Sequence, residues 1–271
     1  AQDKLAKFNA KIGYPEQWKD YSALEVRPDD LVGNIMRSSR VEHRRELAKL
    51  GGPIDRGEWF MTPYTVNAYY NPPMNEIVFP AAILQAPFFN VQADDAVNYG
   101  GIGAVIGHEF SHGFDDQGRK SDGDGNLRDW WTEADAEAFA ERANALVAQY
   151  EEFEVLPGQF LNGEFTLGEN IGDLSGLAVA YRAWQMSLDG QPAPVIDGFT
   201  GEQRFFIGWA QVWRRLYRDE NLEMRLTNDP HSHSEARSNG VVRNFDAWYE
   251  AFNVQPDAAL YLPPEQRVTI W

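Results

Sequence analysis

The sequence predicts a predominantly helical α+β fold with one small sheet. Most of the chain carries helical patterning, β-prone residues are confined to short segments, and a His-Glu-x-x-His motif at 108–112 lies within one of the expected helices. The 271 residues are 43% hydrophobic and 13% aromatic, which is enough apolar material for a substantial core. Many helices and few strands are the balance of the α+β class.

Helical patterning comes first along the chain, over residues 1–50. It is interrupted at Gly13-Tyr14-Pro15, because glycine and proline are the commonest local breaks in a helix. It ends at Gly51-Gly52-Pro53, a combination typical of a helix stop. We therefore expect helices on both sides of one break before the chain becomes extended.

A β-hairpin is expected next. Val66–Tyr70 and Glu76–Pro80 are β-prone, and Asn71–Asn75 between them has the composition of a turn. Since proline cannot donate a hydrogen bond to a β-ladder, Pro80 predicts that one of these strands is an edge strand.

The remainder of the chain is expected to be helical, with an acidic, glycine-rich loop at 115–129. The expected helices span 96–114, 132–152, 169–188, 202–219 and 241–252. Glycines at the start of the first make that segment pliant. The second begins with a capping box, in which Thr132 is followed at the third helical position by Asp135 in place of the usual glutamate.

Composition excludes several kinds of function. A formal charge of −17 argues against nucleic-acid binding, because the phosphate backbone requires a basic surface. The absence of cysteine excludes disulfides and thiolate metal sites and leaves the redox compartment open. No apolar run approaches the ~20 residues of a membrane span.

The His-Glu-x-x-His motif indicates a zinc site. Residues four apart lie on one face of a helix, so His108 and His112 can share one metal ion while Glu109 faces an open coordination position. An open position is what metal-assisted hydrolysis requires, whereas structural zinc sites are closed. We therefore expect one zinc ion per chain, with Glu109 as the general base toward a water molecule.

A third ligand is predicted in Gly168–Asp173. Glu169 and Asp173 are four residues apart on an expected helix, so their carboxylates point the same way. Two surface acids would look the same, but the apolar neighbours would bury this pair, and buried carboxylates need partners. We predict that Glu169 binds the zinc and that Asp173 accepts a hydrogen bond from a ligand imidazole.

A third segment, residues 228–237, carries a transition-state histidine. His231 is predicted to donate to the developing oxyanion, with Asp229 stabilising its charged form. Arg237 offers a bidentate fork to a substrate carbonyl or carboxylate. His233 is interpreted as exposed and uninvolved, and His43, which lies among charged residues, is interpreted in the same way.

Two further segments carry weaker patterns. Asn67 and Ala68 lie on the expected edge strand, where main-chain groups could hold an extended peptide, although both could equally be ordinary hairpin residues. The loop from Asp122 resembles a calcium-binding EF-hand loop, but Leu127 stands where the sharp turn needs glycine and Trp130 occupies the ninth position. We therefore do not expect calcium there.

Together these segments resemble the neprilysin and endothelin-converting-enzyme family of zinc metallopeptidases, in its bacterial form. The similarity runs through the whole chain and is carried by Val66–Tyr70, Ile77–Gln85, His108–Asp115, Gly168–Asp173, Trp209–Trp213, His231 and Arg237. The resemblance implies a thermolysin-like catalytic domain with a small edge-strand sheet and a zinc-binding active-site helix.

The resemblance also implies roles for individual residues. The implied zinc ligands are His108, His112 and Glu169; Glu109 is the base, and Asp173 and Asp115 hold the ligand imidazoles. The implied substrate contacts are His231, Arg237, Asn67 and Ala68, with a hydrophobic pocket lined by Ile83, Phe88, Val105, Val212 and Trp213. Each apolar residue of that pocket could equally be ordinary core packing.

Two departures from the family shape the expected organisation. The family's large helical N-terminal domain, which caps the site, is missing, so we expect a separate or cleaved N-terminal chain as partner. Residues 1–58 then form a helical strut between lobes and 59–271 the catalytic core. The cysteines of animal members are absent, which suits a bacterial protein in the periplasm or secreted.

The sequence thus predicts a zinc endopeptidase that cleaves short peptides on the amino side of hydrophobic residues. One alternative is a subunit that keeps the catalytic fold but is inactive, or only binds, without a separate N-terminal chain. Another is a hydrolase of a different amide. The intact set of zinc ligands and Glu109 favours the peptidase.

Overall fold

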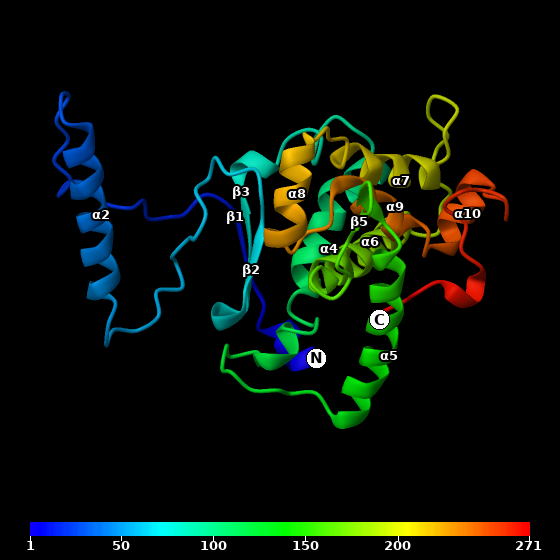
Figure 1. Cartoon of the computed structure of the whole chain (residues 1–271), viewed down its shortest axis with the longest axis horizontal. Coiled ribbons are helices and arrows are strands. Elements are labelled where there is room, and N and C mark those ends of the chain that lie inside the picture. The colour runs from blue at the N-terminus through cyan, green and yellow to red at the C-terminus, as the bar shows by residue number, and fades with distance from the viewer.

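The computed structural model describes residues 1–271 and has the predicted class, mostly helical with two small sheets. The longer helices are α2 (Leu31–Ala48), α4 (Ala104–Ser111), α5 (Glu133–Glu151), α6 (Leu167–Ser187), α7 (Gly201–Val212), α8 (Asp219–Asn228) and α9 (Ser234–Val242). Short ones are α1 (Gln2–Ala6), α3 (Asp95–Asn98) and α10 (Asp246–Phe252). None is long and apolar enough to cross a membrane. In Figure 1 the helices from α4 onward form the body, and α2 stands apart beyond the sheet.

The larger sheet has the strand order β1-β3-β2. The predicted hairpin is present: β2 (Tyr69–Asn71) pairs antiparallel with β3 (Glu76–Pro80). The prediction that one strand of the hairpin is an edge is confirmed: β2 lies at the edge of the sheet, whereas β3, which contains Pro80, is central. Pro80 is tolerated there since the ladder with β2 stops at Val78.

The first strand was not expected from the sequence. Residues 9–13, placed in a helical region by their pattern, form β1 (Asn9–Gly13), which runs parallel to β3. The Nζ of Lys11 lies 2.8 Å from a carboxylate oxygen of fully buried Glu76 and so joins the two strands. A pairing between segments this far apart in sequence leaves no local pattern that predicts it.

The main core lies between the helices of the body. Its centre is made of large buried side chains, among them Trp184, Trp209, Tyr150 and Phe205. A smaller cluster, which contains Ile77 and Phe79 of β3, joins the sheet to the body. The cleft described below lies between these two clusters, so both its walls rest on packed side chains.

The predicted helices are present with adjusted ends. The Thr132–Asp135 capping box of α5 is confirmed. The helix expected at 96–114 runs from Asp95 to Ser111, and its glycine-rich part, Tyr99–Gly103, is a π-helix between α3 and α4. The helix expected at 202–219 ends at Val212, and the one expected at 241–252 is divided between α9 and α10. Helix α8 and a two-stranded sheet, β4 (Glu154–Leu156) and β5 (Gln159–Phe160), were not predicted.

Candidate zinc site

Helices α4 and α6 cross closely and bring the two ligand motifs together. Glycine at the crossing allows this: a Cβ on Gly107 would lie 2.5 Å from the carbonyl oxygen of Gly176. On the same face of α6, a Cβ on Gly172 would lie 2.7 Å from Cε1 of His108. The imidazole of His108 can therefore lie against the α6 backbone, one turn from Glu169.

Ligand atoms of His108, His112 and Glu169 converge. The two Nε2 atoms are 2.9 Å apart, and the Glu169 Oε2 lies 3.2 Å from the Nε2 of His108 and 3.8 Å from that of His112. A tetrahedral zinc with bonds of about 2.0–2.1 Å separates its ligand atoms by roughly 3.3 Å, which these distances bracket. The three residues therefore fit the ion.

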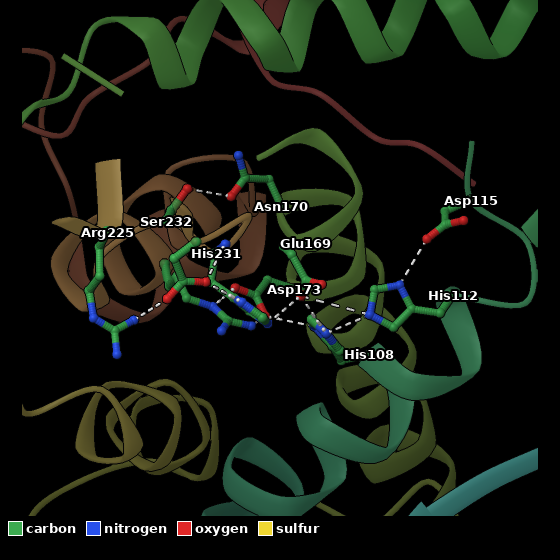
Figure 2. A network of polar contacts seen from close by, with 11 residues as sticks. His108, His112, Asp115, Glu169, Asn170, Asp173, Arg225, His231 and Ser232 are labelled. Carbon is green, nitrogen blue, oxygen red and sulfur yellow. Dashed lines mark hydrogen bonds and ion pairs between the residues drawn. The ribbon is translucent and has the colours of Figure 1, made fainter. Parts of the chain in front are cut away.

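Each ligand imidazole is oriented by a carboxylate (Figure 2). Nδ1 of His108 lies 2.8 Å from Asp173, and Nδ1 of His112 lies 2.8 Å from Asp115. When the Nδ1 proton is donated to a carboxylate, the Nε2 lone pair is free. Two lone pairs that face each other at 2.9 Å repel unless a cation or a proton lies between them, which is a second reason to place a metal here.

The electrostatics without metal agree with this placement. Burial lowers the pKa of His108, but the carboxylates of Asp173 and Glu169 outweigh it and raise that pKa to about 10. Burial raises the pKa of Glu169, and hydrogen bonds from His108 and His231 outweigh it, so this pKa is well below its usual range. A cation is thus favoured among these groups.

Glu109 differs from the ligand Glu169 in that burial sets the direction of its pKa shift. It is buried beside them and lines the cleft. Burial raises the pKa of Glu109, and the neighbouring imidazoles only partly offset this effect. A carboxylate with a raised pKa is suited to accept and return a proton near neutral pH.

Asp229 holds His231 at the other side of Glu169. Nδ1 of His231 lies 2.7 Å from Asp229, and its Nε2 lies 3.0 Å from Glu169. Burial lowers the pKa of His231, but the hydrogen bond to Glu169 and the charge of Glu169 outweigh it, with Asp229 adding to the rise. The charged form of His231 is therefore favoured.

Arg237 is engaged inside the protein. Its Nε and Nη2 each lie 2.6 Å from an oxygen of Asp173, and its guanidinium stacks 4.1 Å above the ring of Trp213. The fork that the sequence analysis assigned to substrate is thus occupied on one edge by Asp173. Because Asp173 also binds His108, Arg237 is linked to the zinc ligand through one carboxylate.

A cleft of about 1020 Å³ collects the predicted residues. The predicted metal, catalytic and substrate-contact residues that line it are His108, His112, Glu169, Glu109, Asp115, Asp173, Asp229, His231, Arg237, Asn67, Ala68, Ile83, Phe88, Val105, Val212 and Trp213. Ile83 is 2% exposed and belongs to the smaller core cluster, so it supports the wall more than it forms its surface. Phe88 and Val105 pack against it and are more exposed to the cleft.

Four supporting residues escaped the sequence analysis. Arg225 of α8 pairs with Asp229, four residues later on the chain. The hydroxyl of Ser232 donates to Asn170 of α6 at 2.7 Å and ties the His231 loop to the residue beside Glu169 (Figure 2). Lys4 donates to the carbonyls of the 118–121 turn, at 2.8 and 2.7 Å, among three aromatic rings.

Of these contacts, only the Arg225–Asp229 ion pair could have been predicted from the sequence, because the two residues are four apart. That prediction would have required helix α8 to be recognised first. The interpretation of His233 as exposed was wrong. Its side chain is partly buried, its Nδ1 has no hydrogen-bond partner, and burial lowers the pKa of the imidazole.

The chain is similar to known peptidases along nearly its whole length. The model of "Peptidase family M13" matches residues 67–268. Neprilysin of Homo sapiens is 39% identical over 285 aligned residues, which cover 100% of this chain and 38% of neprilysin. Endothelin-converting enzyme 1 of Mus musculus is 41% identical, with 100% and 36% covered. The chain thus spans well under half the length of these relatives.

Two solved bacterial structures are also similar. The zinc metalloprotease ZMP1 of Mycobacterium tuberculosis superposes with a TM-score of 0.97 at 62% identity, over 99% of this chain and 42% of that one. PepO of Lactobacillus rhamnosis superposes with a TM-score of 0.90 at 40% identity, over 100% of this chain and 42% of that one. The likeness includes the whole arrangement of sheet and helices described above.

Proposed function

The chain belongs to peptidase family M13, and from that premise we propose that it is the catalytic portion of a zinc endopeptidase. It hydrolyses short peptides on the amino side of hydrophobic residues and holds one zinc ion. The observation that carries the proposal is the convergence of His108, His112 and Glu169 at the floor of the cleft, beside buried Glu109.

The residues around the metal group divide the chemistry among them. Zinc, when bound, supplies a Lewis acid that polarises the scissile carbonyl. Glu109 takes a proton from the attacking water and delivers it to the leaving amine, which its raised pKa favours. His231, kept charged by its acidic neighbours, donates to the oxyanion as it forms. Asp173 and Asp115 keep the ligand imidazoles in one tautomer.

The substrate is an extended peptide laid along the sheet. Asn67 and Ala68 directly precede β2, which is an edge strand, so their main-chain groups are placed to pair with a peptide backbone. Across the cleft, Phe88, Val105 and Val212 offer an apolar wall for the side chain that follows the scissile bond. Together these two features select a hydrophobic residue on the carboxyl side of the cut.

A further part of the polypeptide, or a separate chain, packs on α2. That helix has no buried residues, and apolar side chains on it are more than half exposed, including Leu31 (74%) and Val32 (70%). The relatives are more than twice as long as this chain. Exposed apolar patches of this kind mark interaction surfaces. A helical N-terminal domain is the partner we propose, in a protein located outside the cytoplasm.

The exposed helix also favours the second candidate, a subunit that is inactive until the partner binds. Peptide hydrolysis separates the two. The chain is purified with and without its flanking sequence. Each protein is given quenched fluorescent peptides in which Phe, Leu or Gly follows the bond to be cleaved, in the presence and in the absence of zinc. Zinc-dependent cleavage before Phe and Leu by this chain alone supports a self-sufficient peptidase. Activity that appears only after the N-terminal partner is added supports a subunit that is inactive on its own. Activity toward non-peptide amides alone would exclude both.

A further inference from the structure

Lys4 of α1 is a cation in the interior of the protein. It is 3% exposed, and its Nζ lies between 5.6 and 5.8 Å from the ring centroids of Tyr70, Phe114 and Trp130. Such surroundings are costly for an ammonium group unless it donates hydrogen bonds to partners inside the protein. The groups that accept these bonds are therefore the ones that hold Lys4 in this position.

The ammonium donates to the turn that follows the zinc-binding helix. Its Nζ lies 2.8 Å from the carbonyl oxygen of Gly118 and 2.7 Å from that of Ser121. In Figure 1 the N-terminal end of the chain lies beside this turn, below α4. Burial lowers the pKa of Lys4 to about 8, although the charges of Asp115 and Asp122 oppose this effect. At neutral pH the side chain therefore carries its charge while it holds the two carbonyls.

Gly118 connects Lys4 to a zinc ligand. Its backbone N–H donates to Oδ1 of Asp115 at 2.7 Å, and Oδ2 of Asp115 lies 2.8 Å from Nδ1 of His112 (Figure 2). Gly118 lies directly on the end of α4, since a Cβ there would be 2.1 Å from the carbonyl oxygen of His112. Three consecutive hydrogen bonds thus join the ammonium to the imidazole.

The orientation of the Asp115 carboxylate depends on this turn. Its Oδ1 accepts hydrogen bonds from two backbone N–H groups, those of Gln117 at 2.9 Å and Gly118 at 2.7 Å. Both donors are fixed by the conformation of the backbone, so a turn that shifts also shifts the carboxylate. A carboxylate that moves no longer keeps the imidazole of His112 in one orientation.

The other ligand imidazole has an analogous support. The carboxylate beside His108 belongs to Asp173, and the guanidinium of Arg237 holds it with two hydrogen bonds of 2.6 Å. Each carboxylate that orients a ligand imidazole is thus held by a buried cation. The contact is direct for Asp173 and passes through the turn for Asp115.

We propose that Lys4 is a positioning residue of the zinc site: it fixes the turn around Gly118, so that Asp115 keeps the imidazole of His112 directed at the metal. This rests on the zinc site of the proposed function. A residue that only stabilised the fold would affect both ligand imidazoles alike, whereas a residue that acts through Asp115 affects His112 alone.

The test compares Lys4→Met with the parent protein, both with their natural flanking sequence. Methionine occupies similar space among the rings but has neither charge nor donor. We expect the zinc dissociation constant, measured by competition with a chelator, to rise about tenfold, the lower end of the range for residues that orient a metal-bound imidazole. In zinc-loaded protein with isotope-labelled histidine, the nuclear magnetic resonance signal of Nδ1 of His112 should shift, and that of His108 should not.

Lys7→Met is the matched control, because Lys7 belongs to the same segment but is paired with Asp3 and Asp124 rather than with the turn. It should leave both measurements unchanged. Unchanged zinc affinity in Lys4→Met, or equal shifts of the two imidazole signals, overturns the proposal.

A double-mutant cycle tests whether Lys4 acts through Asp115. In Asp115→Asn, the additional change Lys4→Met should cause little further loss of zinc affinity, whereas losses that add would overturn the proposal. If Lys4→Met does not fold, Lys4→Gln, whose amide is a donor without charge, takes its place in the same cycle. If zinc binds but no peptide is cleaved, the peptidase falls and the zinc affinities still decide on Lys4. If the parent protein binds no zinc, both fall.

Discussion

The imidazole of His108 lies against Gly172, so closely that a Cβ at residue 172 would be 2.7 Å from the Cε1 of the ring. This contact is what brings the α4 motif within reach of Glu169, three residues before Gly172 on α6. The contact is possible only because residue 172 has no side chain. The metal geometry of His108 on α4 therefore requires glycine at this position of α6.

Gly172→Ala should accordingly weaken zinc binding, because His108 must move away from its position opposite His112 and Glu169. Overpacking of this kind costs about 1–3 kcal/mol. Competition with a chelator of known affinity would measure the loss. Gly208→Ala on α7 is the control, since its Cβ would lie 2.7 Å from the Val97 carbonyl, away from the metal group. Equal zinc affinity in Gly172→Ala and the parent protein would show that the contact does not matter.

Glu169→Ala should remove tightly held zinc, because only two of the three ligands remain. Metal analysis after dialysis should find less than the single zinc expected per chain. Glu223→Ala, which changes an exposed acid of α8, should retain it. Full zinc retention by Glu169→Ala would exclude Glu169 as a ligand.

Glu109→Gln should keep zinc and lose turnover. The amide preserves the shape of the side chain but accepts no proton, and proton transfer of this kind contributes about 10²–10⁴-fold. Paired measurements of zinc content and kcat test this. A variant with normal zinc and near-normal kcat would contradict the role of Glu109 as base.

His231 and Arg237 should differ in how they affect the reaction. His231→Phe removes an oxyanion donor worth about 3–4 kcal/mol, so kcat should fall roughly 10²–10³-fold with KM little changed. Arg237→Ala should raise KM and also lower stability, because the buried carboxylate of Asp173 loses its partner. Steady-state kinetics and thermal unfolding distinguish the two. A change in KM alone for His231→Phe would assign it to substrate binding.

Local sequence was sufficient where the chemistry depends on helical spacing. The positions of His108 and His112, of Glu169 and Asp173, and of the Thr132 cap follow from residues three or four apart, and the helices that carry them are present. Family likeness added the substrate wall, and the cleft contains all of those residues. The roles assigned to them stay predictions until the variants are measured.

Local sequence failed where structure depends on distant partners. Strand β1 was mistaken for part of a helical region because its pairing with β3 involves residues more than 60 positions away. Helix α8 was missed because its apolar face is short: Leu222 and Leu226 lie one turn apart, and none of its residues is fully buried. That omission hid Arg225, which acts on His231 through Asp229.

The sequence by itself was sufficient to predict the class of fold, the metal ligands proposed here and the proposed base, since each depends on spacing within one helix or on one motif. Only the tertiary structure decided that α4 and α6 meet glycine to glycine and that Arg237 is held by Asp173. The reason is physical: helical periodicity is encoded by neighbours along the chain, whereas close approach and charge pairing are settled by the packing of segments far apart in sequence.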